Sequence, residues 1–329
     1  MTTCFNGKTV LITGGTGSFG KAFATFLLNG TDVKKVIIFS RDELKQYHLE
    51  KEISDPRLRC FIGDIRDLPR LERAFAGVDI VVHAAALKQV PALEYNPMEA
   101  VKTNIIGSQN VIEAAIDQKV SKVLLISTDK AAHPANLYGS TKLCAEKLFI
   151  AANSYAKSVT RFGVVRYGNV IGSRGSIVEV LLKNKNNDKV LITDLEMTRF
   201  WIDLKQACDL VTYALEQLEG GEMFIPKIPS MRLVDLFDAI VPHAAKEVVG
   251  IRLGEKIHEV LLTEQEARHA VELDKYFIVI PEFAFWSTEP FQKYYFLGKS
   301  PGPQFSFASH TNTEWLTKDD LKKITDTIC

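Results

Sequence analysis

A glycine-rich turn between a short strand and a helix is the feature that most constrains the fold of this chain. The apolar, β-branched run at 8–13 predicts a buried parallel strand. It leads directly into Thr13-Gly14-Gly15-Thr16-Gly17-Ser18-Phe19-Gly20, which opens a helical pattern at 18–28. Glycines allow a tight turn and a close approach of the backbone to a pyrophosphate, and the helix N-terminus supplies N–H donors. In this context the turn predicts a dinucleotide site.

The rest of the N-terminal half alternates between strand and helix patterns. Helical patterns at 42–51, 71–75 and 100–116 lie between short apolar runs. This alternation predicts an α/β fold with a doubly wound parallel Rossmann sheet. The further strands are expected at 36–39, 57–62, 79–83, 123–127 and 164–167.

The pattern becomes irregular after about residue 168. A helix at 204–218 and a strand at 223–225 predict a return to the sheet. We therefore expect a Rossmann domain at 1–168 with a return segment at about 200–226. A smaller, discontinuous α/β substrate domain is expected at 169–199 and 227–329, the latter including a C-terminal tail with a final helix at 317–324.

The composition excludes several classes of function. Lys plus Arg and Asp plus Glu each total 40, so there is no basic footprint for nucleic acid. No apolar run approaches the roughly 20 residues that span a bilayer, and the early first strand leaves no room for a signal peptide. The five cysteines are scattered without metal-ligand spacing, so we expect no metal site and reduced thiols in a cytoplasmic protein.

The end of the second predicted strand indicates which dinucleotide is bound. NAD enzymes usually place an acid there, on the ribose 2′-hydroxyl. This chain has Ser40 and Arg41, with Lys45 a turn further on, and these suit a 2′-phosphate better. Asp42 fits the N-cap of the following helix. We expect NADP.

Further cofactor contacts are expected after the third and fourth strands. Asp64, followed by Ile65, can place a carboxylate beside the adenine amino group or can serve as a strand-end turn acid. The small residues Ala84 and Ala85 stand where the chain must pass under the cofactor. Lys88 follows and points from a strand end toward the expected cleft. His83 is expected to be a packed core histidine.

The strongest chemical signal is Ser127-Thr128-Asp129-Lys130 followed by Tyr138-Gly139-Ser140-Thr141-Lys142. On a helix, Tyr-x-x-x-Lys places a phenol and an ammonium one turn apart on the same face. A nearby ammonium can lower the pKa of tyrosine from roughly 10, which makes a base for oxidation of an alcohol. A simple dehydrogenase needs neither Asp129 nor Lys130. The pair therefore predicts oxidation followed by further proton chemistry.

Together, TGGTGSFG, STDK, YGSTK and VRYGNVIGSRGS resemble the extended short-chain dehydrogenase/reductases that act on nucleotide sugars. Relatives that act as 4,6-dehydratases on TDP-glucose are similar but carry Asp-Glu where this chain has Asp129-Lys130. The lysine resembles the inverting UDP-N-acetylglucosamine 4,6-dehydratases, which open pseudaminic acid biosynthesis for flagellin glycosylation. The likeness covers nearly the whole chain, including the tail SHTNTEWLTKDDLKKI.

This resemblance implies a lyase that uses NADP internally. Tyr138, assisted by Lys142 and Thr128, would deprotonate the sugar 4-hydroxyl while hydride passes from C4 to the cofactor. Lys130 would then remove the C5 proton, and Asp129 would protonate the departing C6 hydroxyl. Hydride returns to C6 and C5 is inverted. Ser127, Tyr138 and Lys142 would also contact the cofactor, and relatives form dimers or larger rings, which implies a homo-oligomer.

The resemblance also implies where a UDP-sugar is bound. The run from Gly172 to Ser176, which includes Arg174, would line the sugar diphosphate, and Lys88 could meet phosphate or ribose. The other implied substrate contacts are Asn169, Val170, Gly175 and Ser176 at the diphosphate, Val178 and Thr193 at the uridine, Arg199 at a phosphate, and Arg252, Glu255 and His258 at the ribose and phosphates.

Three interpretations stay open. The first is the inverting dehydratase. The second is another nucleotide-sugar enzyme on the same fold, either a retaining 4,6-dehydratase or a 4-epimerase, although an epimerase needs no Asp-Lys pair. The third is a redox-sensing Rossmann protein that binds NADP without catalysis, which predicts a broken Tyr-x-x-x-Lys, whereas the motif is intact in this chain. The residues do not identify the sugar's 2-substituent.

Overall fold

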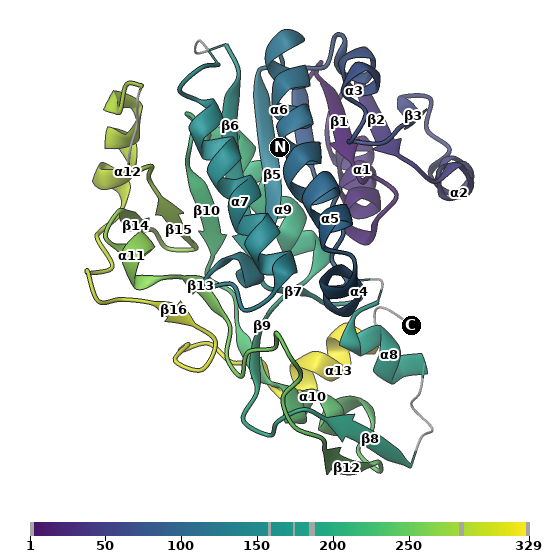
Figure 1. The fold of residues 1–329 in the computed structure, drawn as a ribbon, viewed down its shortest axis with the longest axis vertical. Coiled ribbons are helices and arrows are strands. Elements are labelled where there is room, and N and C mark those ends of the chain that lie inside the picture. The colour runs from purple at the N-terminus through teal and green to yellow at the C-terminus, as the bar shows by residue number, and fades with distance from the viewer. Residues whose placement is uncertain (1–2, 157–158, 174, 184–187, 283–285, 327–329) are drawn as a thin grey trace.

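The computed structural model describes residues 3–156, 159–173, 175–183, 188–282 and 286–326. Within these residues the main feature is a nine-stranded sheet in the order β14-β15-β10-β6-β5-β4-β1-β2-β3 (Figure 1). Seven neighbouring strands of this sheet run parallel, namely β10, β6, β5, β4, β1, β2 and β3. Strands β15 and β14 are antiparallel to their neighbours. The strands are β1 (Thr9–Thr13), β2 (Lys35–Ser40), β3 (Leu58–Ile62), β4 (Ile80–His83), β5 (Lys122–Thr128), β6 (Arg161–Tyr167), β10 (Met223–Pro226), β14 (Ala270–Glu272) and β15 (Tyr276–Val279).

Helices cover both faces of this sheet, which confirms the predicted doubly wound fold. Helices α3, α6 and α7 pack side by side on one face, and α1 packs with α9 on the other (Figure 1). The central strands are buried on both sides, as their unbroken apolar runs predicted. These helices are α1 (Ser18–Gly30), α2 (Glu43–Ile53, beside β3), α3 (Leu68–Phe75), α6 (Gly107–Asp117), α7 (Leu137–Ala152) and α9 (Leu204–Gln217).

A smaller part of the chain lies beyond the carboxyl ends of the parallel strands (Figure 1). It holds a three-stranded sheet in the order β11-β9-β7 and two strand pairs, β8 with β12 and β13 with β16. Trp201, Leu236 and Phe237 form part of a second apolar core. Its elements are β7 (Asn169–Val170), α8 (Ile177–Lys183), β8 (Lys189–Ile192), β9 (Thr198–Ile202), β11 (Ser230–Arg232), α10 (Leu233–Ile240), β12 (Ala245–Val248), β13 (Val260–Leu262), β16 (Phe307–Ala308) and α13 (Lys318–Asp326).

The structure departs from the predicted organisation at two places. Residues 227–329 were expected to lie wholly in the smaller domain, but β14 and β15 extend the main sheet. Phe277 and Ile278 of β15 are buried there, so this hairpin covers an edge of β10 that would otherwise be unpaired. The predicted helix at 100–116 is a π-helix, η1 (Val101–Ile106), followed by α6.

The remaining short helices connect these layers. Helices α4 and α5 lead into η1, η2 follows β5, α11 precedes β14, and η3 leads into α12 at the outer edge of the sheet. Their bounds are α4 (Val90–Tyr95), α5 (Pro97–Ala100), η2 (Asp129–Ala131), α11 (Glu264–Ala267), η3 (Glu289–Phe291) and α12 (Gln292–Leu297).

A buried ion cluster ties β6 to two helices. The Arg166 side chain is fully buried, and its Nη2 lies 2.6 Å from Glu146 of α7 and 2.8 Å from Glu266 of α11. Its Nη1 also donates to the carbonyl of Leu261. Charges in the interior are tolerated only when they are paired and hydrogen-bonded, so each member of this cluster depends on the others.

Replacing Arg166 by Met should lower the free energy of unfolding by about 3–5 kcal/mol, because it leaves buried Glu146 without its partner. Arg161→Met is the control on the same strand. Arg161 pairs with Glu219 at the surface, and its loss should cost less than about 1 kcal/mol. Urea unfolding followed by circular dichroism gives both values. Equal, small losses would show that the buried cluster does not hold the layers together.

Candidate active site

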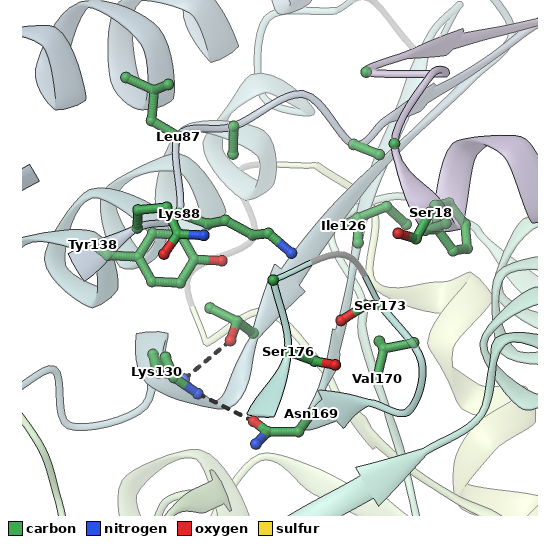
Figure 2. A pocket seen from close by; sticks show the side chains of 18 of the residues that line it. Ser18, Leu87, Lys88, Ile126, Lys130, Tyr138, Asn169, Val170, Ser173 and Ser176 are labelled. Atoms are coloured by element: carbon green, nitrogen blue, oxygen red, sulfur yellow. Dashed lines mark hydrogen bonds between the residues drawn. The ribbon is translucent and has the colours of Figure 1, made fainter. Parts of the chain in front are cut away.

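A cavity of about 900 Å³ opens at the carboxyl ends of the parallel strands, against the smaller part of the chain. This is the edge at which doubly wound sheets bind ligands. Figure 2 shows Lys88 and Tyr138 on one side of it and Ser173 and Ser176 on the other. The predicted site residues that line it are Gly14, Thr16, Gly17, Ser18, Phe19, Gly20, Ser40, Arg41, Lys45, Asp64, Ile65, Ala84, Ala85, Lys88, Ser127, Thr128, Lys130, Tyr138, Lys142, Asn169, Val170, Gly175, Ser176, Thr193, Arg199, Arg252 and Glu255.

The glycine turn leaves room that side chains would fill. Gly14 has φ +66°, and a Cβ there would lie 2.8 Å from the backbone of Ala85. A Cβ on Gly20 would lie 2.5 Å from Gly15 Cα, so α1 can approach the strand only with glycine at this position. Gly17 caps α1 without a side-chain acceptor. The turn therefore presents backbone and a helix N-terminus to the cavity, which fits a dinucleotide pyrophosphate.

The residues after β2 and β3 form a charged rim at the same end of the cavity. Asp42 accepts a hydrogen bond from the Lys45 backbone N–H (3.0 Å), which confirms it as the N-cap of α2. Asp64 lies 2.6 Å from Arg66 and 3.7 Å from Arg41. Burial raises the pKa of Asp64, but the hydrogen bonds and charge of Arg66 outweigh burial and lower it. Asp64 thus serves as a strand-end turn acid while also facing the cavity.

His83 is a core residue, as the sequence predicted. Its Nδ1 lies 2.7 Å from Thr13 Oγ1 and its Nε2 lies 3.1 Å from Ser108 Oγ. Burial, with a smaller effect of the Lys142 charge, lowers the pKa of His83 to about 3. The ring therefore stays neutral and links β1 and β4 to α6.

Asp129 and Lys130 lie in η2, directly after β5. Lys130 Nζ lies 3.0 Å from Asp129 Oδ1. It also lies 3.4 Å from Asn169 Oδ1 (Figure 2). The Thr128 hydroxyl also donates to Asp129 Oδ1, at 2.9 Å. Asp129 is completely buried just behind the cavity wall, and its Oδ2 has no hydrogen-bond partner among the described residues. An orphaned carboxylate oxygen at this position is suited to exchange a proton.

Burial shifts the pKa values of Tyr138 and Lys142, whereas neighbouring carboxylates set the direction of the shift at Lys130. It raises the pKa of Tyr138 to about 12, although Lys130 and Thr128 oppose the shift, and it lowers the pKa of Lys142 to about 8. The predicted lowering of the tyrosine pKa is therefore wrong for the free protein, because desolvation outweighs the nearby ammonium groups. Burial also lowers the pKa of Lys130, but the Asp129 and Glu259 carboxylates outweigh it and raise this pKa above its usual range.

Three residues that support the site have no distinctive signal in the sequence. Glu259 is buried with Oε1 3.7 Å from Lys130 Nζ. Glu146 accepts from the Ser127 hydroxyl at 2.5 Å. Asn104 of η1 bonds both the N–H and the carbonyl of Leu87, which fixes the loop after β4. The π-helix that carries Asn104 is a frequent feature of functional sites, but the sequence predicted an ordinary helix there.

The structure does not bring every predicted substrate residue to the cavity. Val178 is buried in the second apolar core. His258 stacks on His310, with ring centroids 4.2 Å apart, and lies outside the cavity lining. Arg199 reaches the cavity, but its guanidinium donates to three backbone carbonyls of the smaller part. Arg174 lies outside the described residues.

The described residues include no helix both long and apolar enough to cross a membrane.

Comparisons with known proteins agree with this geometry. The family model described as "Polysaccharide biosynthesis protein" matches residues 10–281. The chain is 46% identical to the inverting UDP-N-acetylglucosamine 4,6-dehydratase of Campylobacter jejuni subsp. jejuni, over 97% of this chain and 98% of that protein. It is 39% identical to a UDP-glucose 4-epimerase of Rickettsia massiliae, over 97% and 96%. The crystal structure of Pen from Bacillus thuringiensis is 39% identical, with a TM-score of 0.89 and 99% of both chains covered. The chain belongs to the polysaccharide biosynthesis protein family.

Proposed function

We propose that this protein is a 4,6-dehydratase that removes water from UDP-N-acetylglucosamine and inverts C5. The observation that carries the proposal is the ion pair at the end of β5 between buried Asp129 and half-buried Lys130, with Tyr138 lining the same cavity as Lys130. The chain is 46% identical to a relative named dehydratase and 39% identical to a relative named epimerase. The pair distinguishes the two chemistries, because 4-epimerisation needs only oxidation and reduction at C4 whereas dehydration needs an acid and a base at C5 and C6.

Oxidation at C4 is assigned to Tyr138 with Thr128 and Lys142. When bound along the glycine turn, oxidised NADP supplies a hydride acceptor for C4, positive charge near the phenol, and the same hydride for return to C6. Added positive charge favours the phenolate of Tyr138, whose pKa of about 12 keeps it protonated in the free protein. Tyr138 then takes the proton of the sugar 4-hydroxyl.

Loss of water is assigned to Asp129 and Lys130. In the free protein Lys130 is an ammonium paired with Asp129, so it can act as a base only after giving up a proton. The proton can pass along the 3.0 Å contact to Asp129, because exclusion of water by the substrate weakens the advantage of the ion pair. The amine then takes the C5 proton, and the carboxylic acid protonates the departing C6 hydroxyl. The pair returns to ammonium and carboxylate. C6 takes back the hydride while C5 takes a solvent-derived proton from the opposite face, and the proton that Tyr138 took from the 4-hydroxyl leaves to solvent.

Product analysis in deuterated water tests the reaction, the substrate and the inversion together. Incubation of the protein with NADP and UDP-N-acetylglucosamine should give a 6-deoxy-4-keto sugar that carries deuterium at C5. The coupling constants in its NMR spectrum should show the L configuration. A product epimerised only at C4, with C6 oxygen retained, would replace this proposal with the epimerase.

Two substitutions should separate the oxidation from the elimination. Tyr138→Phe should lower the rate of the first oxidation by about 10²–10⁴-fold, because no base remains for the 4-hydroxyl. Lys130→Ala should still oxidise C4 but lower water loss by about the same factor. Stopped-flow absorbance at the nicotinamide band follows the oxidation, and NMR follows the product. Water loss at nearly the wild-type rate in Lys130→Ala would rule out this lysine as the base.

We also propose that the cofactor is NADP rather than NAD. The support is that Ser40, Arg41 and Lys45 all line the cavity. Asp42 lines it too, but its carboxylate is engaged as the cap of α2. A guanidinium and an ammonium suit a 2′-phosphate.

Arg41→Ala should weaken NADP binding by at least about tenfold, because a charge-assisted contact to a phosphate is worth about 1.5–3 kcal/mol. NAD is the matched control ligand, since it lacks the phosphate, and its affinity should change less than about threefold. Isothermal titration calorimetry measures both. Tighter binding of NAD than of NADP by the unaltered protein would contradict the assignment.

The pathway, the cellular location and the oligomeric state are proposed from the resemblance to inverting UDP-N-acetylglucosamine 4,6-dehydratases. The 6-deoxy-4-keto-L-hexose would enter pseudaminic acid biosynthesis and, through it, flagellin glycosylation. We further propose a cytoplasmic homo-oligomer, in which a cofactor domain and a substrate domain enclose the cavity. Comparison of the molar mass in solution with the 36.8 kDa of one chain tests the oligomer.

A further inference from the structure

The C-terminal tail, defined here as residues 305–316, reaches the support of the active site. Ser309 follows β16 and is completely buried. Its N–H donates to the carbonyl of Glu259 at 2.8 Å, and its hydroxyl accepts from the N–H of Glu259 at 2.9 Å. The same hydroxyl lies 2.6 Å from Thr198 Oγ1 of β9. Ser309 therefore fixes the backbone of Glu259 on both sides.

The buried side chain of Glu259 extends from this fixed backbone toward Lys130, at the end of β5. Only 3% of the residue is exposed. Its Oε1 lies 3.7 Å from Lys130 Nζ and 4.0 Å from Arg199 Nε, and its Oε2 lies 3.1 Å from Lys256 Nζ. Among the described residues, Asp129 and Glu259 are the carboxylates within ion-pair distance of Lys130.

Positive and negative side chains alternate around Lys130 at these distances. Three cations, Lys130, Lys256 and Arg199, surround Glu259, and one further carboxylate, Asp129, contacts Lys130. Without Glu259, the two other cations would repel the Lys130 ammonium with no carboxylate between them. A buried charge that loses its partner moves or loses its proton.

We propose that Glu259, fixed by Ser309 of the tail, is a positioning residue that holds the Lys130 amine at the cavity and controls the release of its proton. Its role in catalysis rests on the proposed function, whereas its effect on Lys130 does not. The tail is then part of the active-site support, although it lies far from the reacting groups in the sequence.

The electrostatics of the cluster give the direction of the effect. Burial lowers the pKa of Lys130, the carboxylates of Asp129 and Glu259 raise it, and Arg199 opposes them. Lys88 and Tyr138 face Lys130 from the other elements of the wall. Burial lowers the pKa of Lys88, and the charge of Lys130 lowers it further. Burial raises the pKa of Tyr138, and the charge of Lys130 opposes that rise. Removal of the Glu259 charge should therefore let Lys130 lose its proton at a lower pH.

Chemical labelling of the free protein tests this coupling without substrate. A carboxylate within about 4–6 Å shifts a pKa by about 1–3 pH units, and each unit changes the fraction of neutral amine tenfold. At pH 9, acetic anhydride should therefore acetylate Lys130 at least about tenfold faster in Glu259→Gln than in the unaltered protein. Mass spectrometry of peptides gives the rate, with exposed Lys205 as internal reference.

Glu314→Gln is the matched control, because it removes an exposed carboxylate from the same tail. It should leave the acetylation of Lys130 unchanged within about twofold. Ser309→Ala keeps the carboxylate but removes one of its backbone contacts, so it should shift the labelling in the same direction by a smaller factor. If circular dichroism shows that Glu259→Gln does not fold, Ser309→Ala carries the test.

Turnover supplies the second readout. In Glu259→Gln, the alkaline pH at which kcat for water loss drops to half of its plateau should fall by about one unit or more, because the Asp129–Lys130 pair must keep one proton to supply both its acid and its base. KM should change less than about threefold. Unchanged labelling of Lys130, or a loss of kcat without a shift of its pH profile, would overturn the positioning role. A labelling shift in a protein that never converts UDP-N-acetylglucosamine would retain the coupling and overturn the proposed function instead.

Discussion

The paired charges at the end of β5 are the constraint on which the site depends. Asp129 and Lys130 come from the central sheet, whereas Glu259 and Arg199 come from the smaller part of the chain. Buried charges are tolerated only when they are paired, so the sheet and the smaller part must meet at this cluster. The same contact closes the cavity over the ends of the strands and brings an acid, an amine and a phenol to one place.

Burial of Tyr138 and the carboxylates beside Lys130 explain why the free protein holds these two groups in resting forms. Tyr138 keeps its proton and Lys130 stays charged, so neither is a base before ligands bind. Lys142 is the exception, because burial lowers its pKa to about 8 although the charge of Glu146 opposes the shift. Proton transfer is thus conditional on the charge and the exclusion of water that the ligands bring, which limits side reactions.

The sequence predicted what depends on local patterns. The glycine turn, the first six strands, the core position of His83 and the N-cap at Asp42 follow from residue type and spacing over a few positions. It did not predict Glu259 or Asn104, because their roles come from contacts between segments more than 15 residues apart. The β14–β15 hairpin was assigned to the wrong layer for the same reason, since an edge strand is defined by its neighbour.

A crystal structure of the protein with NADP and UDP-N-acetylglucosamine would test the central claim most directly, with Lys130→Ala used to slow turnover. We expect Tyr138 Oη to lie about 3–3.5 Å from the 4-hydroxyl, and a lysine rebuilt at position 130 to reach C5 of the same ring. It would be contradicted by a hexose whose C5 and C6 face away from η2, with Asp129 separated from the C6 oxygen by other side chains.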